Sequence, residues 1–157
     1  MFYKRTIKQN ITLSKTPHLV LTAEDINDRE IFIIGDVHGC LEELNELLRL
    51  AKTELNGKSL LPIFVGDFTN KGPHNLSTIR RIRAENAYTV KGNHEENVIK
   101  QYFIRQERQN YIVPDKYKWI TELVADDIQF LQELPYTIHI PYKMQLLSMQ
   151  VTFQENR

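Results

Sequence analysis

Three short glycine-flanked motifs follow one another along the chain and carry the side chains best suited to chemistry. They are 35–39 (Gly-Asp-Val-His-Gly), 66–73 (Gly-Asp-Phe-Thr-Asn-Lys-Gly-Pro) and 92–95 (Gly-Asn-His-Glu). They offer two aspartates, two histidines and, in the third motif, an asparagine. Carboxylate and amide oxygens together with imidazole nitrogen suit manganese, iron, zinc or magnesium. The motifs therefore indicate a divalent-metal site of the kind that acts on phosphate esters.

Four of these side chains are candidate metal ligands. Asp36 and Asp67 supply anionic oxygens, His38 supplies an imidazole nitrogen, and Asn93 supplies a neutral carbonyl oxygen. A carboxylate such as Asp67 can bridge two cations, and metals about 3.5–4 Å apart stabilise both the attacking and the leaving oxygen of an in-line displacement. Such metals also lower the pKa of bound water toward about 7 in the best zinc case, which provides hydroxide at neutral pH.

Two further residues fit direct roles in catalysis or substrate binding. His94 adjoins a proposed ligand at the expected start of a helix, where it can protonate a leaving alkoxide as general acid. Lys71 is a cation inside the motifs and can hold a phosphate oxygen as a point charge. We assign His94 and Asp67 to catalysis, and Lys71 and Asn93 to substrate binding.

The apolar pattern predicts the elements that position these motifs. Continuous apolar runs at 31–34 and 60–65 fit buried strands, and a shorter strand is expected at 87–91. Apolar residues at helical spacing predict helices over 41–51 and 76–82. This strand–helix order predicts βαβ units with right-handed crossovers, so that all three motifs reach one edge of a parallel sheet.

Further elements are expected on both sides of the motifs. We expect short strands at 18–21 and 136–140, and another at 145–153. A longer helix should run from residue 94 or 95 to about 106. The pattern over 115–134 is helical again, with a break near 126.

Composition limits the kinds of partner. The 157 residues suffice for one domain, and the formal net charge of zero argues against an extended nucleic-acid surface, although a local nucleotide pocket stays open. The single cysteine, Cys40, excludes a disulfide or a cysteine-based zinc site within one chain. No signal peptide or membrane-length apolar run is visible. We expect a cytoplasmic protein without membrane contact, and the sequence leaves the oligomeric state open.

Several conspicuous residues also have structural interpretations. Any single motif could be a strand-end turn or a helix cap, and only their order favours a metal site. Glu95 and Glu96 fit a helix N-terminus better than chemistry. Aromatic residues at helical spacing fit a core better than a base-stacking surface: Tyr117, Trp119 and Phe130. The basic run 80–83 fits a solvated helix face, and His139 a strand position.

The three motifs resemble the pattern GDxHG, GDxxDRG, GNHE of the calcineurin-like and PPP phosphatases. The first and third match, whereas the second has Asn70-Lys71 where the protein phosphatases have Asp-Arg. Its Lys-Gly-Pro ending and the run 135–138 (Pro-Tyr-Thr-Ile) are similar to the ApaH-like branch, relatives of bacterial diadenosine tetraphosphatases. The resemblance implies the N-terminal portion of an α/β/β/α sandwich, with a metallophosphoesterase domain over 29–157 after an extension of 1–28.

The resemblance also implies two divalent ions, with manganese, iron, zinc or magnesium as the metal. The first ion would be held by Asp36, His38 and Asp67. The second would be bound by Asp67, as a bridge, and by Asn93. His94 would act as the acid, and the lysine of the second motif would take over the phosphate-binding role of the missing arginine.

The implied activity is metal-dependent hydrolysis of phosphate esters or anhydrides. Nucleoside polyphosphates, such as diadenosine tetraphosphate or capped RNA ends, are the leading substrate class, with phosphoproteins as a further possibility. Family members have two later metal-binding histidines, and 145–153 does not supply them. We therefore expect a shortened form in which the second metal keeps only Asp67 and Asn93. The alternative function is binding of metal, phosphate or a partner without turnover.

Overall fold

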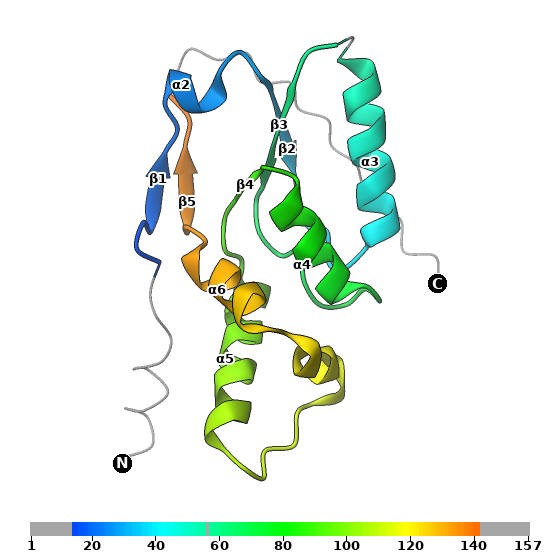
Figure 1. Cartoon of the computed structure of the whole chain (residues 1–157), viewed down its shortest axis with the longest axis vertical. Helices are drawn as coiled ribbons and strands as arrows, with labels where there is room; N and C mark the ends of the chain where they lie inside the picture. Colours follow the sequence, from blue (N-terminus) through cyan, green and yellow to red (C-terminus); the bar gives the residue numbers. More distant parts are fainter. Residues whose placement is uncertain (1–13, 56, 142–157) are drawn as a thin grey trace.

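A parallel three-stranded sheet forms the centre of the computed structural model, which describes residues 14–55 and 57–141 (Figure 1). The strand order is β2 (Glu30–Ile34), β3 (Leu60–Phe64), β4 (Tyr88–Thr89). β3 and β4 lie within the segments predicted for them, and β2 begins at Glu30, just before the predicted segment 31–34. The order of elements confirms the predicted βαβ arrangement.

Five helices follow β2 in the described part of the chain. Their bounds are α3 (Leu41–Glu54), α4 (Asn75–Ala84), α5 (Asn93–Glu107), the 3₁₀ helix η1 (Asp115–Glu122) and α6 (Ala125–Glu133). The predicted helices at these places are confirmed, and the chain between η1 and α6 contains the break that we expected near residue 126. The 3₁₀ form of η1 was not predicted, because apolar spacing does not separate it from an α-helix over so short a stretch.

The strand register sets the position of the motifs. Ile34 of β2 pairs with Phe64 of β3, and Phe64 pairs with Thr89 of β4. The three strands therefore reach the same level at their carboxyl ends, and the segments after them emerge at one edge of the sheet. This is the edge at which ligands bind in open α/β sheets.

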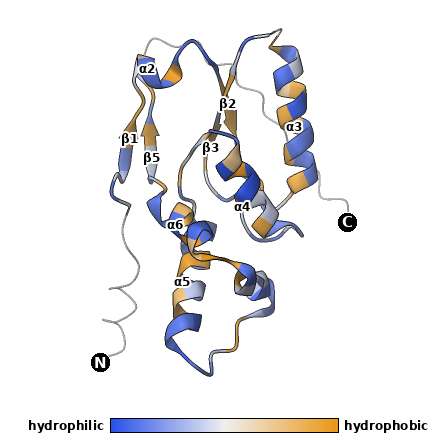
Figure 2. Ribbon diagram, viewed as in Figure 1, coloured by the Kyte–Doolittle hydropathy of each residue, from blue (hydrophilic) through white to orange (hydrophobic). Residues whose placement is uncertain are grey.

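One face of the central sheet packs against helices. Phe32, Ile34 and Phe64 point to this face and join the larger apolar core. The helices contribute the buried side chains Leu44, Leu48 and Ala51 from α3 and Ile79 and Ile82 from α4. Figure 2 shows hydrophobic residues alternating with hydrophilic ones along α3, as expected for a helix with one buried face.

The opposite face packs against a second, smaller sheet. Here β1 (His18–Val20) and β5 (Thr137–His139) pair in parallel, and Leu19 and Ile138 from these strands contact a core that includes Ile31, Leu61 and Ile63. Successive side chains of β2 and β3 thus enter different cores, which is the period-two pattern of a strand buried on both faces. The resulting order of helix, sheet and sheet confirms the predicted fold class.

A short helix, α2 (Ala23–Ile26), lies between β1 and β2 and was not predicted. Thr22 caps it, since its hydroxyl accepts a hydrogen bond from the Asp25 N–H at 3.2 Å. Because β1 pairs with β5, part of the predicted extension 1–28 packs with the domain, and the proposed division at residue 28 stays a prediction. The strand predicted at 145–153 lies outside the described residues.

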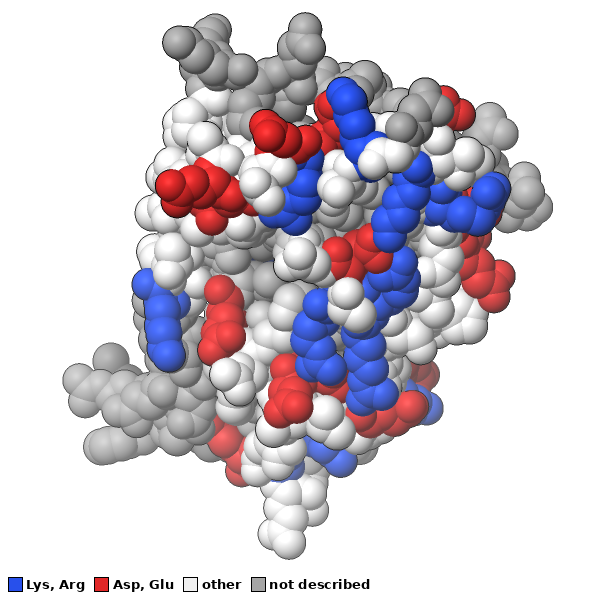
Figure 3. Space-filling model, turned by 45° about the horizontal axis from the view of Figure 1, so that its top comes forward, with Lys and Arg blue, Asp and Glu red and all other residues white. Residues whose placement is uncertain are grey.

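Charges of both signs are distributed over α4 and its surroundings. Arg81 and Lys52 pair with Glu85, and the guanidinium groups of Arg80 and Arg83 lie 2.9 and 3.2 Å from Asp127. Figure 3 shows Lys and Arg side chains interspersed with Asp and Glu over one face of the molecule. The basic run 80–83 is therefore paired with carboxylates rather than simply solvated.

None of the described helices is long and apolar enough to cross a membrane.

Asp127 joins α6 to α4 and gives a first testable expectation. Burial alone would raise the pKa of this carboxyl. Hydrogen bonds from Arg80 and from the Val124 N–H, together with the positive charges of Arg80 and Arg83, outweigh burial and lower the pKa. A carboxyl with a depressed folded-state pKa stabilises the fold above its unfolded pKa, and that contribution is lost as the pH falls.

Asp127→Asn should therefore destabilise the fold by about 1–2 kcal/mol at pH 7, below the cost of breaking a fully buried pair because both arginines stay hydrated. Urea unfolding at pH 7 and at pH 3 measures this, and the difference from wild type should shrink at pH 3. Asp126→Asn, an exposed neighbour, is the matched control. Equal destabilisation by both variants would contradict the ion-pair account.

Candidate metal centre

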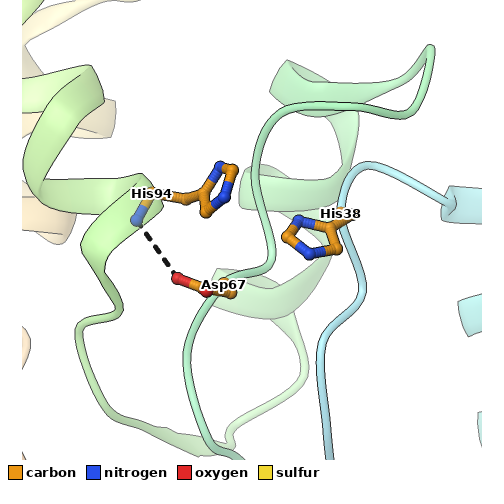
Figure 4. Close-up of side chains that lie close together, drawn as sticks. All are labelled: His38, Asp67 and His94. Atoms are coloured by element: carbon orange, nitrogen blue, oxygen red, sulfur yellow. Dashed lines mark hydrogen bonds between the residues drawn. The ribbon is translucent and has the colours of Figure 1, made fainter.

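Asp67 occupies the middle of the candidate site. It follows β3 with a left-handed backbone (φ 49°), and its Oδ1 accepts a hydrogen bond of 3.1 Å from the backbone N–H of His94. His94 is the second residue of α5, so the carboxylate lies against the positive end of that helix (Figure 4). The helix thus stabilises a negative charge on Asp67.

His38 is held in a defined tautomer. Its Nδ1 lies 3.2 Å from the carbonyl oxygen of Thr69, which can only accept, so Nδ1 carries a proton. Nε2 keeps its lone pair because the ammonium of Lys71 beside it can only donate. Nε2 lies 3.3 Å from Oδ2 of Asp36 and 2.9 Å from Nζ of Lys71. Nε2 of His38 and Oδ2 of Asp36 are both acceptors and repel each other at this distance. The positive charge of the Lys71 ammonium, which lies against Nε2, offsets that repulsion.

A cluster of three potential ligands results. One ligand atom each from His38, Asp67 and His94 lies within 4.8 Å of the others, and all three residues are half-buried. Figure 4 shows the His38 and His94 side chains approaching from different segments, and their ring centroids are 4.8 Å apart. Histidine metal ligands commonly donate their second ring N–H to a carbonyl, as His38 does. His38 and Asp67 therefore fit a divalent cation, with His94 beside it.

Close backbone packing brings motifs two and three together. A Cβ on Gly92 would lie 2.1 Å from Oδ1 and 2.4 Å from the backbone nitrogen of Asp67. A Cβ on Gly66 would lie 2.8 Å from the nitrogen of Gly92, and Gly66 also has a positive φ of 94°. Only glycine fits at both places, so these two glycines allow the third motif to approach Asp67.

Glu95 links motifs two and three through hydrogen bonds to their backbone. The side chain is fully buried, and its carboxylate accepts hydrogen bonds from the backbone N–H groups of Asp67 (2.9 Å), Gly92 (2.9 Å) and Thr69 (3.0 Å) and from the Thr69 hydroxyl (2.8 Å). Burial raises the pKa of this carboxyl, and the hydrogen bonds partly oppose the rise. Glu95 thus holds the backbone of Asp67, Thr69 and Gly92 together beside the candidate metal site.

Sequence reasoning missed this role. Glu95 is the third residue of α5 after the N-cap Gly92, the spacing of a capping box, and that signal points only to the helix start. The bonds to Asp67 and Thr69 span 28 and 26 positions and depend on the tertiary fold.

Backbone strain is also concentrated at this site, since His38, Asp67, Asn70 and Lys71 all have positive φ.

The structure brings most of the predicted site residues together. Asp36 is exposed and contacts His38, while Lys71 contacts His38 rather than standing apart as a free phosphate ligand. His94, which we predicted as an acid and not as a ligand, lies in the ligand cluster. Asn93 is exposed at the first position of α5, and its metal and substrate roles remain predictions.

The layered α/β fold, with a histidine–carboxylate cluster at the ends of parallel strands, defines the class as a metallophosphoesterase-type domain. A family model described as calcineurin-like phosphoesterase matches residues 30–152. The chain belongs to the calcineurin-like phosphoesterase family. This confirms the family resemblance seen in the three motifs.

Curated relatives point to two branches of the family. A symmetrical bis(5'-nucleosyl)-tetraphosphatase of Janthinobacterium is 40% identical over 70 residues, which cover 43% of this chain and 25% of the relative. An asymmetrical bis(5'-nucleosyl)-tetraphosphatase of Halalkalibacterium halodurans is 44% identical over 72 residues (40% of this chain, 29% of the relative). Serine/threonine-protein phosphatase 2 of Salmonella typhimurium is 34% identical over 116 residues (72% and 51%).

Solved structures agree with the fold. A crystal structure provisionally described as a diadenosine tetraphosphatase aligns with a TM-score of 0.64 and 27% identity, over 80% of this chain and 50% of that one. A metallophosphoesterase from Sphaerobacter thermophilus aligns with a TM-score of 0.50 and 26% identity, over 67% and 40%. The chain thus spans about a quarter to a half of the length of the proteins it matches.

Proposed function

We propose that this protein hydrolyses phosphoanhydride bonds of nucleoside polyphosphates with the help of a divalent metal ion. The observation that carries the proposal is the cluster of His38, Asp67 and His94 at the carboxyl ends of the parallel strands. The similarity to bis(5'-nucleosyl)-tetraphosphatases supports the substrate class. Manganese as the metal and a cytoplasmic location belong to the same proposal.

The contacts suggest which residues would bind the metal and which would donate a proton. His38 through Nε2, together with Asp36 and Asp67, would hold the ion, and Asn93 would add a ligand for a second one. When bound, the metal supplies a water of lowered pKa at neutral pH and neutralises phosphate charge. His94, whose backbone N–H fixes the Asp67 carboxylate, would donate a proton to the leaving oxygen.

Lys71 would change its partner when the site is loaded. Its ammonium now donates to His38 Nε2 at 2.9 Å, the lone pair that a metal needs. An ion on Nε2 excludes this hydrogen bond, because the nitrogen has one lone pair. The freed ammonium is exposed and can then hold a phosphate oxygen of the substrate as a point charge.

The second candidate function is binding of metal or phosphate without turnover. It is favoured by the composition of the cluster, because in the described part of the chain the His, Asp and Glu side chains that meet supply ligands for one ion. A single ion lacks the paired arrangement that stabilises both oxygens of the displacement.

Incubation with Mn²⁺ and diadenosine tetraphosphate, with release of nucleotide products followed over time, separates the two functions. We expect Mn²⁺-dependent hydrolysis in the wild type and a loss of at least about 100-fold in His94→Ala, the usual scale of general acid catalysis. The Mn²⁺ affinity of both proteins is measured in parallel. Tight Mn²⁺ binding without hydrolysis would overturn the hydrolase and support the binding function. Hydrolysis that survives the substitution would contradict the role of His94.

A further inference from the structure

A chain of two hydrogen bonds leads from η1 to His94. The indole Nε1 of Trp119 lies 3.3 Å from Oδ1 of Asn70, and Nδ2 of Asn70 lies 3.2 Å from Nδ1 of His94. Asn70 is buried, with 4% of its surface exposed, so these two contacts occupy both ends of an amide that water scarcely reaches. Neither contact belongs to the proposed metal ligands, the proton donor's reaction or the phosphate contact of Lys71.

The indole group fixes the orientation of the amide. An indole N–H is a donor only, so the Asn70 atom that faces Trp119 must be the oxygen. The amide nitrogen then faces His94, and it can only donate. Nδ1 of His94 is therefore the acceptor, and the proton of the neutral imidazole must sit on Nε2.

We infer that Trp119 is a positioning residue that acts through Asn70 to hold His94 in the Nε2–H tautomer. The tautomer follows from the contacts alone. Its use, donation from Nε2–H to a leaving oxygen, rests on the proposed function. Without the indole, the Asn70 amide could turn over and present its oxygen to Nδ1, which would move the proton to the other ring nitrogen.

The surroundings keep the three side chains in place. Tyr117 and Ile120 bury η1 in the main core, and the partly buried ring of Trp119 packs against the same core while its N–H reaches Asn70. Asn70 has a left-handed backbone (φ 65°), a conformation that asparagine tolerates better than most residues. The indole therefore has both an apolar and a polar role, of which helical spacing revealed only the first.

The chain has one tryptophan, so one indole N–H signal reports directly on the first hydrogen bond. We would record this signal and the imidazole ¹⁵N signals of His94 by NMR on the full, metal-free chain, with His94→Gln to assign them. In the wild type we expect an unprotonated Nδ1 and a protonated Nε2. A protonated Nδ1 in the neutral ring would overturn the inference.

Trp119→Phe removes the donor and keeps an aromatic ring. One lost hydrogen bond should weaken the preference for the observed amide orientation by about 2- to 12-fold, so the His94 signals should shift toward a mixture of tautomers. Tyr117→Phe, a conservative change at a buried core ring of the same helix, is the matched control and should leave the signals unchanged. Unchanged His94 signals in Trp119→Phe would contradict the inference, and thermal melts identify variants that fail to fold.

Asn70→Asp provides a second, independent variant. A carboxylate can only accept, so it should draw the proton to Nδ1 whether or not the indole is present. Trp119→Phe should then have no further effect on the tautomer in the Asn70→Asp background. If Asn70→Asp leaves Nδ1 unprotonated, Asn70 does not set the tautomer. Since these signals need no turnover, failure of the proposed hydrolysis would leave this test intact. If hydrolysis holds, Trp119→Phe should lower kcat severalfold with little change in KM.

Discussion

Glu95→Ala is expected to destabilise the protein by about 3–5 kcal/mol. The substitution leaves three backbone N–H groups and the hydroxyl of Thr69 without their acceptor, and a buried donor without a partner costs about 1–3 kcal/mol. Water entering the vacated space would recover part of the sum. For a domain of this size, each kcal/mol corresponds to about 2–4 °C in Tm, so melting should occur about 10 °C lower.

The control for this prediction is Glu43→Ala. Glu43 is the third residue of α3, as Glu95 is the third residue of α5, but its side chain is exposed. The two variants share the loss of a carboxylate near a helix N-terminus, worth about 0.3–1 kcal/mol. They differ because Glu95 is buried and hydrogen-bonded, whereas Glu43 is exposed. Denaturant unfolding of both compares them directly. Similar small losses in the two variants would mean that Glu95 is no more than a helix-start residue.

Asp67→Asn is expected to abolish function while leaving the fold largely intact. Asparagine has nearly the same shape, and its Oδ1 can still accept the 3.1 Å hydrogen bond from the His94 N–H. The negative charge in the middle of the cluster is lost, however. Losing a group that only supports a ligand costs about 10–100-fold in metal affinity or activity, so loss of a ligand charge should cost at least about 100-fold in Mn²⁺ affinity.

Calorimetric titration with Mn²⁺, together with a thermal melt, measures both parts of this prediction. Asp28→Asn is the control, because Asp28 is also an aspartate with a left-handed backbone (φ 57°, against 49° for Asp67) but lies in the turn before β2. It should bind Mn²⁺ as the wild type does. Unchanged affinity in Asp67→Asn would remove Asp67 from the metal site.

The sequence predicted the scaffold well because the scaffold depends on local patterns. Apolar runs that end at Gly35 and Gly66 marked two central strands, and leucines at helical spacing marked α3. Since parallel strands end at one edge, these patterns were enough to predict that the three motifs converge there. They did not predict that His94 lies among the potential ligands, because we expected it only as the acid. The pairing of β1 with β5 could not be read from the sequence, because it joins segments about 119 positions apart.

The parts of the site that escaped prediction depend on individual polar contacts. The contact of Lys71 with His38, the buried carboxylate of Glu95 and the indole of Trp119 on Asn70 each join distant segments. Motif spacing places such residues near one another but does not say which atoms meet. The residue types of motif two suggested a phosphate ligand, and only the fold shows that Lys71 can first satisfy an imidazole.

The central claim is that Asp36, His38 and Asp67 meet around a bound cation. Anomalous diffraction from crystals grown with Mn²⁺ tests it most directly, because the metal alone gives a strong signal at the chosen wavelength. We expect a peak within bonding distance of His38 Nε2 and of the Asp36 and Asp67 carboxylates, with the Lys71 ammonium displaced from Nε2. A map with no peak at this position, or with Lys71 still bound to His38 beside a metal held elsewhere, would contradict the account.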